Sequence, residues 1–263
     1  MRLALWQDNS PMGNETTALV RIGQATHAAG AMGAAMLVLP EAFLPGYNHG
    51  DIARLALPRT APVFEKIAAI CRAAGCGVVL GYAEREGQVI FNAAIAFDAA
   101  GNSIAQYRKI QLFGPREKSI YTPGTQYTIF DLHGQKAALL ICYDIEFAQH
   151  VATLAEQGVT LILVPTANME PFHHVVRHTV PTMAANYGVT IVYANYCGSE
   201  GDLTYVGGSL IVGPHGEVLA QAGQDPALII VDIPDRDPAR LSTQAADYRR
   251  VMPVRSAGGS CNE

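Results

Sequence analysis

The sequence predicts an α/β fold in which sheets are covered by helices. Short apolar runs of strand length alternate with stretches whose apolar residues recur at helical spacing. Near-continuous apolar runs occupy the middle of the chain, as expected for central strands covered on both faces. Two further apolar segments fold back at glycine-containing turns, which is typical of β-hairpins. Together these patterns favour sheets sandwiched between helices.

The first third of the chain alternates strands with helices. Residues 2–7 read as a buried strand, residues 18–29 as a helix and residues 36–39 as the next strand. A second helix is expected from 63 to 74, where apolar side chains mark one face. It is expected to end at Gly75, because glycine readily adopts the left-handed conformation found there, and the strand 78–80 follows.

The two expected hairpins resemble each other. Residues 94–97 turn at Gly101-Asn102 into 104–107, and residues 210–212 turn at 214–216 into 218–219. Their likeness is compatible with an internal repeat and equally with two ordinary hairpins. Between them, the sequence predicts the central strands 137–141, 161–164 and 189–193 and the covering helices 146–156 and 172–187.

Composition excludes several classes of function. A chain of 263 residues without a linker is expected to form one domain, 1–263, with the tail from about 245 to 263 extended or at a subunit interface. A net charge of −5 gives no basic surface for nucleic acid. No apolar run approaches the ~20 residues of a membrane helix, and the N-terminus lacks a signal-peptide pattern, so a cytoplasmic protein is expected.

The five cysteines predict reduced thiols rather than disulfides or metal ligands. Their odd number, scattered through a chain too large to need cross-links, favours free thiols. Cys71 and Cys76 are the nearest pair, but no second pair of cysteines or histidines completes a zinc site. We therefore expect neither a metal nor a cofactor.

Cys142 lies where a buried strand is expected to run straight into an amphipathic helix. The unpaired amides and the positive dipole end of a helix N-terminus favour a thiolate, and the same amides can hold an oxyanion. The alternative is a small buried hydrophobic residue, since free cysteine is among the most buried residue types. Local context does not separate these two interpretations.

A nucleophilic thiol needs a base, and none of the eight histidines has a persuasive context. His173, His174 and His178 share one expected helix, where packing or surface roles are the better interpretation. Glu41 follows an apolar strand and Pro40, so that desolvation raises its pKa and suits it to proton transfer. Lys109 ends a hairpin strand and could hold a developing oxyanion. Taken singly, Glu41 could equally cap a loop and Lys109 could lie on the surface.

Three separated motifs resemble those of the nitrilase superfamily: Leu39-Pro40-Glu41, Tyr107-Arg108-Lys109, and Ile141-Cys142-Tyr143-Asp144. Supporting matches extend across nearly the whole chain, among them Gly46-Tyr47, 121–124, Pro165-Thr166-Ala167-Asn168, 207–209 and 213–216. The resemblance implies a four-layer α-β-β-α sandwich that forms a homodimer or higher homo-oligomer. It also implies Glu41 as general base and acid, Lys109 as oxyanion stabiliser and Cys142 as nucleophile, with Glu117 as a second glutamate that orients the substrate or supports proton transfer.

The chain departs from the superfamily pattern at a few positions. Gln111 stands where many members have histidine, and Phe147-Ala148-Gln149 replaces a frequent Phe-Pro-Glu. Thr182 and Ala185 occupy positions where arginine and glutamate are frequent, so a local ion pair is expected to be missing. None of these differences touches the expected bond chemistry.

The segment 192–198, with Glu200 and Tyr205, resembles the branch that hydrolyses small aliphatic or amino-acid-derived amides. We therefore expect an amidase whose partner is a small-molecule amide, with Tyr47, Tyr143 and Asn168 contacting the substrate. The backbone N–H of Tyr143 is expected to join Lys109 at the oxyanion. A nitrilase, an N-carbamoyl amino acid hydrolase and an acyl transferase would use the same catalytic set, and a catalytically silent oligomeric binding protein is the alternative outside enzymes.

Overall fold

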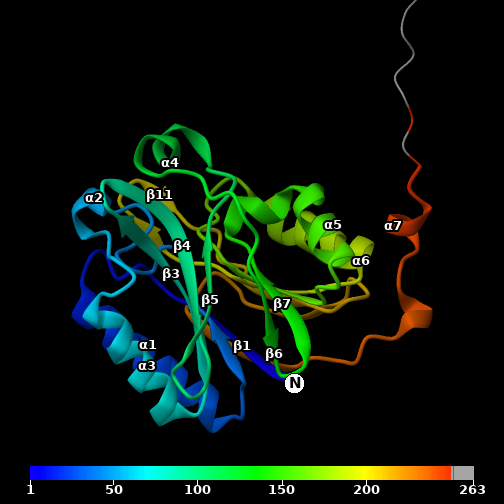
Figure 1. Cartoon of the computed structure of the whole chain (residues 1–263), viewed down its shortest axis with the longest axis horizontal. Coiled ribbons are helices and arrows are strands. Elements are labelled where there is room, and N and C mark those ends of the chain that lie inside the picture. Colours follow the sequence, from blue (N-terminus) through cyan, green and yellow to red (C-terminus); the bar gives the residue numbers. More distant parts are fainter. Residues whose placement is uncertain (250, 252–263) are drawn as a thin grey trace, which may run out of the picture.

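Two six-stranded mixed sheets pack face to face in the computed structural model, which describes residues 1–249 and 251 (Figure 1). The strand order of the first sheet is β14 (Ala227–Asp232), β1 (Arg2–Gln7), β2 (Met36–Val38), β3 (Gly77–Glu86), β4 (Val89–Phe97) and β5 (Ser103–Arg108). The order of the second is β13 (Val218–Gln221), β12 (Leu210–Val212), β9 (Thr190–Ala194), β8 (Leu161–Pro165), β7 (Gln135–Leu139) and β6 (Ile129–Leu132). The three central strands of each sheet are parallel, and their neighbours are antiparallel.

Helices cover the outer face of each sheet, so the predicted four-layer α-β-β-α sandwich is confirmed. Helices α1 (Glu15–Ala31) and α3 (Pro62–Ala74) pack on the first sheet, and α5 (Ala148–Glu156) and α6 (Val180–Tyr187) on the second (Figure 1). Apolar side chains from both sheets fill the space between them, and that space forms the centre of the core. As predicted, Gly75 ends α3 in the left-handed conformation, with φ 62°.

Shorter elements connect these layers. They are the helices α2 (Ile52–Leu55), α4 (Gly114–Ile120) and α7 (Gln244–Asp247), the 3-10 turns η1 (Cys142–Glu146) and η3 (Pro238–Arg240), the π-helical turn η2 (Val175–Thr179), and the two-residue strands β10 (Ser199–Glu200) and β11 (Leu203–Thr204).

The two halves of the sandwich have the same strand order. Both predicted hairpins are present, as β4–β5 and β12–β13, and each forms the outer edge of its sheet beside three parallel strands. On the other side of those parallel strands, β14 pairs with β1 as β6 pairs with β7. Of the two readings of the hairpins, the topology supports an internally repeated architecture.

Two predicted helices begin differently from the sequence expectation. The helix expected from 146 starts at Ala148, because Phe147 has extended backbone angles that separate α5 from the turn η1. The helix expected from 172 opens with helical residues at 173 and 174 and the π-helical turn η2 before α6. The strand expected at 78–80 is longer, because β3 and β4 pair over their whole length as far as Glu86 and Val89.

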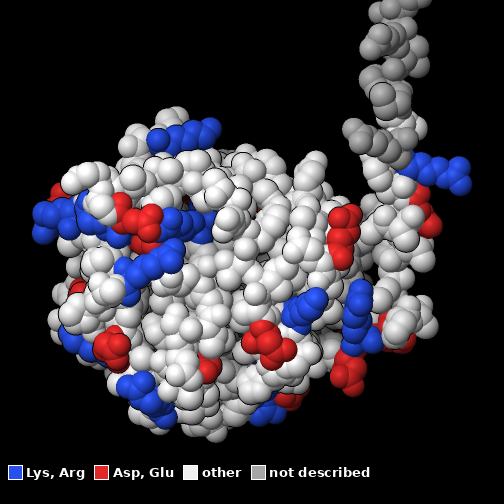
Figure 2. All heavy atoms as spheres, viewed as in Figure 1, with Lys and Arg blue, Asp and Glu red and all other residues white. Residues whose placement is uncertain are grey.

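Most of the predicted C-terminal tail, about 245–263, lies outside the described residues. Its beginning contains α7, which stands beside α6 at the edge of the molecule (Figure 1). Within residues 1–249 and 251, no helix is long and apolar enough to cross a membrane. Figure 2 shows acidic and basic side chains interspersed over one face, separated by wide uncharged areas.

Candidate active site

Three strand ends meet at one end of the sandwich and bring together Glu41, Lys109 and Cys142. Glu41 follows β2 and Lys109 follows β5, both in the first sheet, whereas Cys142 follows β7 in the second sheet. Glu41 and Lys109 are fully buried, and Cys142 retains 9% of its exposed surface. The three residues singled out from sequence therefore share one site, and Cys142 is the one of the three that lines a pocket.

Lys109 forms the centre of a buried ionic cluster. Its Nζ lies 2.7 Å from Oε1 of Glu41 and 2.7 Å from Oε1 of Glu117, which α4 carries. The hydroxyl of Tyr47 donates to the same Glu117 oxygen at 2.7 Å, and the backbone N–H of Phe113 donates to its other oxygen at 2.9 Å. Two buried carboxylates thus share one ammonium, which offsets much of the cost of burying their charge.

One oxygen of Glu41 has no partner among the described residues. Oε1 accepts from Lys109 and, at 2.6 Å, from Nδ2 of Asn92, while Oε2 is buried without a hydrogen bond. Buried carboxylate oxygens are almost always satisfied, so an exception calls for an explanation. An oxygen kept free in this way can take a proton from the thiol or give one to a leaving group.

The site shifts the pKa values of its base and its lysine in useful directions. Burial raises the pKa of Glu41 to about 7, Lys109 opposes the shift and Glu117 adds to it. Burial alone would lower the pKa of Lys109, but Glu117 and Glu41 outweigh it and hold the pKa well above its ordinary value. The glutamate can therefore exchange protons near neutrality, while the lysine stays an ammonium.

The thiol of Cys142 is held in its neutral form, so of the two interpretations that the sequence left open, the structure favours the buried neutral thiol over a thiolate stabilised by a helix N-terminus. Burial, and then the charge of Glu41, raise the pKa of Cys142 well above its ordinary value, against the opposing effects of Lys109 and the backbone N–H of Ala167. Burial is the main cause, and the five-residue 3-10 turn that Cys142 opens is too short to carry the dipole of an α-helix. Such a thiol needs a base to become a nucleophile.

Two of the catalytic candidates lie at strained turns. Cys142 has φ 47°, and Ala42, directly after Glu41, has φ 45°, a left-handed conformation that costs a non-glycine residue about 1–2 kcal/mol. Gly81 makes the second turn possible, because a Cβ there would lie 2.5 Å from the backbone nitrogen of Ala42 and 2.6 Å from the carbonyl oxygen of Pro40. Strain of this kind is typical of functional sites, where packing imposes it.

Asp144 connects the end of β5, next to Lys109, to the turn η1, which Cys142 opens. Its Oδ2 accepts from the hydroxyl of Tyr107 at 2.8 Å and from the N–H of Ile141 at 3.0 Å, and its Oδ1 accepts from the N–H of Gln111 at 2.7 Å. Burial raises its pKa despite these donors. The sequence motif included Asp144 without giving it a role.

Asn92 was also missed by the sequence analysis. It is fully buried in β4, and besides its bond to Glu41 its carbonyl oxygen accepts from the N–H of Lys109 at 2.8 Å. The available signal was a single amide side chain within the otherwise apolar strand from Phe91 to Phe97. A buried polar residue in such a strand indicates a specific partner.

A pocket of about 210 Å³ opens onto the thiol. Its walls come from the segments after β2, β5, β7 and β8, and the lining residues are Tyr47, Phe113, Cys142, Tyr143, Glu146, Ala167, Asn168, Met169, Phe172 and His174. All three residues expected to contact the substrate, Tyr47, Tyr143 and Asn168, are among them. Glu146 and the aromatic residues Phe113 and Phe172 were not anticipated.

Asn168 is held rigidly at this wall. Its N–H donates to Oδ1 of Asn195 at 2.8 Å, its carbonyl oxygen accepts from Nδ2 of the same residue at 3.1 Å, and its side chain donates to the carbonyl oxygen of Phe172 at 3.1 Å. Asn195 in turn donates its N–H to Oγ of Ser209 at 2.8 Å. The orientation of the pocket wall is thus fixed by buried amide groups.

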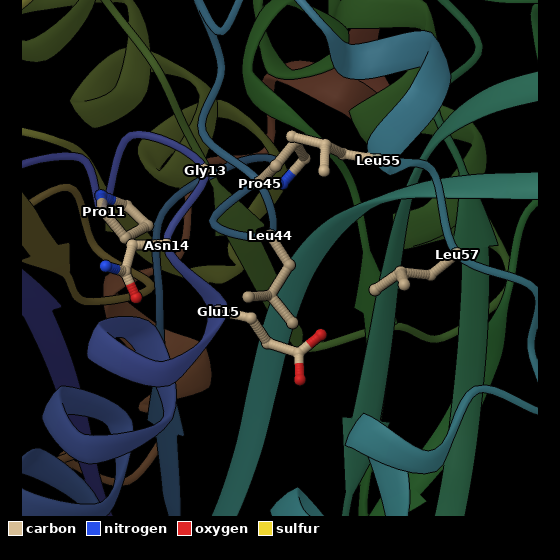
Figure 3. A pocket seen from close by; sticks show the side chains of 8 residues that line it. All are labelled: Pro11, Gly13, Asn14, Glu15, Leu44, Pro45, Leu55 and Leu57. Carbon is tan, nitrogen blue, oxygen red and sulfur yellow. The ribbon is translucent and has the colours of Figure 1, made fainter.

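A second pocket, shown in Figure 3, offers no comparable chemistry. It lies between the start of α1 and the segments around Pro45 and Leu57, and it encloses about 40 Å³. Its only ionisable lining residue is Glu15, which is exposed to solvent. The pocket at Cys142 is therefore the better candidate site.

Of the remaining candidates from sequence, His174 lines the pocket at Cys142, and the others are not among its lining residues. His173 pairs with Glu170 at 2.7 Å, and no group of metal-ligating side chains occurs within the part of the chain that the structure describes. Cys71, Cys76 and Cys197 are free and buried, whereas Cys261 lies outside the described residues.

Comparisons with known proteins agree with the resemblance seen in sequence. The family model described as carbon-nitrogen hydrolase matches residues 2–240. The chain is 43% identical to a protein described as a hydrolase in the pqqF 5' region of Pseudomonas protegens, over 88% of this chain and 81% of that protein. It is 33% identical to an (R)-stereoselective amidase of a Pseudomonas species, over 82% of this chain and 80% of that protein. The solved amidase of Nesterenkonia sp. AN1 superposes with a TM-score of 0.87 at 34% identity, covering 95% of this chain and 96% of that one.

Proposed function

Because the chain belongs to the carbon-nitrogen hydrolase family, the nitrilase superfamily, we propose that it is an amidase that converts small non-peptide carboxamides to carboxylic acids and ammonia through a thioester on Cys142. The chain is thus a hydrolase of carbon–nitrogen bonds other than peptide bonds. A mutant of the Nesterenkonia amidase, 33% identical to this chain, is described with acrylamide added at its active-site cysteine.

In the first half of the reaction, Oε2 of Glu41 takes the proton of the Cys142 thiol, and the sulfur attacks the amide carbon. The carbonyl oxygen becomes an oxyanion, which the Lys109 ammonium and the backbone N–H of Tyr143 stabilise. That N–H is available because the first amides of a helical turn have no partner within the turn. The protonated Glu41 then gives its proton to the nitrogen, the carbon–nitrogen bond breaks, and ammonia leaves.

In the second half, Glu41 takes a proton from a water molecule, and the resulting hydroxide attacks the thioester carbon. The same donors hold the second oxyanion. Collapse of this intermediate breaks the carbon–sulfur bond, the acid leaves, and Glu41 returns its proton to the sulfur of Cys142. The same glutamate thus acts as base and as acid in both half-reactions. A pKa close to neutrality suits it to both roles.

One observation carries this proposal: Glu41 holds Lys109 and Asn92 with one oxygen and leaves the other free in a buried site. A glutamate that only capped a loop or formed a structural ion pair would use both oxygens. We propose that Glu117 keeps Lys109 in place and fixes, through Tyr47, the floor of the pocket. Asn168 is proposed to contact the amide group.

The same three residues would hydrolyse a nitrile through a thioimidate or release the carbamoyl group of an N-carbamoyl amino acid. The amide is favoured because two compared proteins of similar length are described as amidases. We also propose that the chain forms a single domain, that the protein is cytoplasmic, and that it assembles as a homodimer or higher homo-oligomer.

The test is a panel of small amides, nitriles and carbamoyl compounds, with ammonia and acid both measured. We expect amides to give equal amounts of the two products. A Cys142→Ala variant that keeps the wild-type circular dichroism spectrum is expected to release no ammonia above background. If that variant works at the wild-type rate, the assignment of the nucleophile is wrong. If nothing in the panel is hydrolysed, the silent binding protein becomes the better interpretation.

A further inference from the structure

The substrate pocket contains a carboxylate that the proposed reaction does not use. Glu146, the last residue of the turn η1, lines the pocket four residues after the nucleophile, and it is partly buried. Neither a hydrogen bond nor an ion pair joins its side chain to another group within residues 1–249 and 251. A charged group held without a partner at a ligand site indicates a partner supplied by the ligand.

Two groups of the protein oppose the effect of burial on Glu146, but neither forms an ion pair with it. Burial raises the pKa of Glu146, and His174 and Lys109 only partly oppose the shift. Lys109 is held at 2.7 Å by each of two other carboxylates. His174 is exposed at the rim, where water screens a charge effectively. The carboxylate of Glu146 is therefore available to pair with a cation that a ligand brings.

The other walls of the pocket suit the same kind of ligand. The ring of Phe113 packs edge-on against Tyr143 with centroids 5.3 Å apart and against Phe172 at 5.6 Å, so a cluster of aromatic rings lines the same pocket as Glu146. An ammonium group is attracted to the face of an aromatic ring, and more strongly when it is partly desolvated. Aromatic rings beside one carboxylate form a site for an organic cation, and they disfavour a second negative charge.

We propose that Glu146 determines specificity by binding an ammonium group on the acyl chain of the substrate, so that the preferred substrates are small amino-substituted carboxamides. This inference rests on the proposed amidase function and refines it. The amide carbon lies at Cys142 and the ammonium at Glu146, and the short turn η1 fixes both positions. Amides that carry a carboxylate on the acyl chain are disfavoured.

The experiment compares pairs of amides that have the same shape and differ in charge. The main pair is 3-aminopropanamide and butanamide, in which an ammonium replaces a methyl group. Aminoacetamide with propanamide and 4-aminobutanamide with pentanamide test shorter and longer chains, and 4-amino-4-oxobutanoate tests a negative charge. We expect kcat/KM to be about 10-fold or more higher for the cationic member of the best pair, the usual effect of a hydrogen bond to a charged group.

Glu146→Gln keeps the shape of the side chain and removes its charge. We expect this variant to lower the cationic-to-neutral ratio of kcat/KM by about 10-fold, and Glu146→Arg to favour 4-amino-4-oxobutanoate over 3-aminopropanamide. The ratio does not depend on how much of a preparation is folded, because both substrates are measured on the same sample. Glu65→Gln, which removes an exposed charge from α3, is the matched control and leaves the ratio unchanged.

Two failures are distinguishable. If neutral and cationic amides are hydrolysed equally at every chain length, or if Glu146→Gln keeps the wild-type ratio, Glu146 does not recognise a cation and the amidase function stands. If no amide of either kind is hydrolysed, the amidase function itself fails.

Discussion

The pH dependence of hydrolysis tests the proposed role of Glu41 most directly. The burial of Glu41 raises its pKa to about 7, and the Cys142 thiol is neutral in this range. Only the ionised glutamate can take the thiol proton, so the active fraction of free enzyme grows from about one eleventh at pH 6 to about ten elevenths at pH 8. We therefore expect kcat/KM for a neutral amide such as butanamide to rise about 10-fold between these pH values.

The same pKa affects folding, which provides an independent measurement. The folded protein binds the Glu41 proton more tightly than the unfolded chain, where the ordinary value of 4.5 applies. The contribution of Glu41 to stability is therefore greatest below pH 4.5 and falls as the pH rises to about 7, by about 3 kcal/mol. Glu41→Gln lacks the titrating carboxyl group, so its unfolding free energy does not show this loss. The difference in unfolding free energy between wild type and variant should therefore change by about 3 kcal/mol between pH 4.5 and pH 7.

The assay is ammonia release at subsaturating butanamide from pH 5 to pH 9, with urea unfolding at pH 5 and pH 7.5. Glu41→Gln is expected to lose at least about 100-fold in kcat/KM at pH 8, because a general base contributes roughly 100- to 10,000-fold. Its residual reaction should rise only at higher pH, where the thiol ionises. A wild-type profile that is flat from pH 5 to pH 8, or an inflection that persists in Glu41→Gln, would refute the assignment of the base.

Two further predictions concern the groups that hold the site together. Lys109→Met leaves two carboxylates buried without their shared ammonium, so we expect it to lower the unfolding free energy by about 3–5 kcal/mol; an unchanged urea midpoint would contradict the ionic cluster. In Asp144→Asn, an NH2 group replaces Oδ2, which accepts from Tyr107 and from the N–H of Ile141, so that this buried N–H loses its partner. We expect the unfolding free energy to fall by about 2 kcal/mol and kcat to decrease. Asp131→Asn, at an exposed position in the edge strand β6, is its control and should shift stability by less than about 0.5 kcal/mol.

Local patterns in the sequence were sufficient to predict most of the fold. The strand 2–7 is β1 to the residue, because a short apolar run without competing turn signals has one interpretation. The helix 63–74 and its end at Gly75 were predicted because the periodic apolar face and the left-handed glycine are properties of neighbouring residues. The covered central strands followed from their unbroken hydrophobicity.

Features that depend on contacts distant in sequence were not predictable in the same way. Within the 3-10 turn that Cys142 opens, Asp144 accepts from Tyr107 in the edge strand β5 and from Gln111 after that strand, and no local sequence pattern indicates those bonds. Asn92 belongs to the site only because β4 lies beside β5 in the folded protein. Without those partners, the sequence predicted an ordinary helix start after the thiol and did not separate a thiolate from a buried neutral thiol.

The internal repeat explains why the fold alone does not determine the chemistry. The segment Leu39-Pro40-Glu41 after β2 corresponds in register to Val164-Pro165-Thr166 at the end of β8. The two segments meet where the N–H of Glu41 donates to the carbonyl oxygen of Thr166 at 3.2 Å. The hydroxyl of Thr166 instead bonds to its own strand at Val164. A carboxylate at this position, one hydrogen bond from the backbone of Glu41, would add a like charge beside that of Glu117 and raise the pKa of Glu41 further above its ordinary value. The neutral Thr166 in the second half is therefore compatible with a base in the first half that exchanges protons near pH 7.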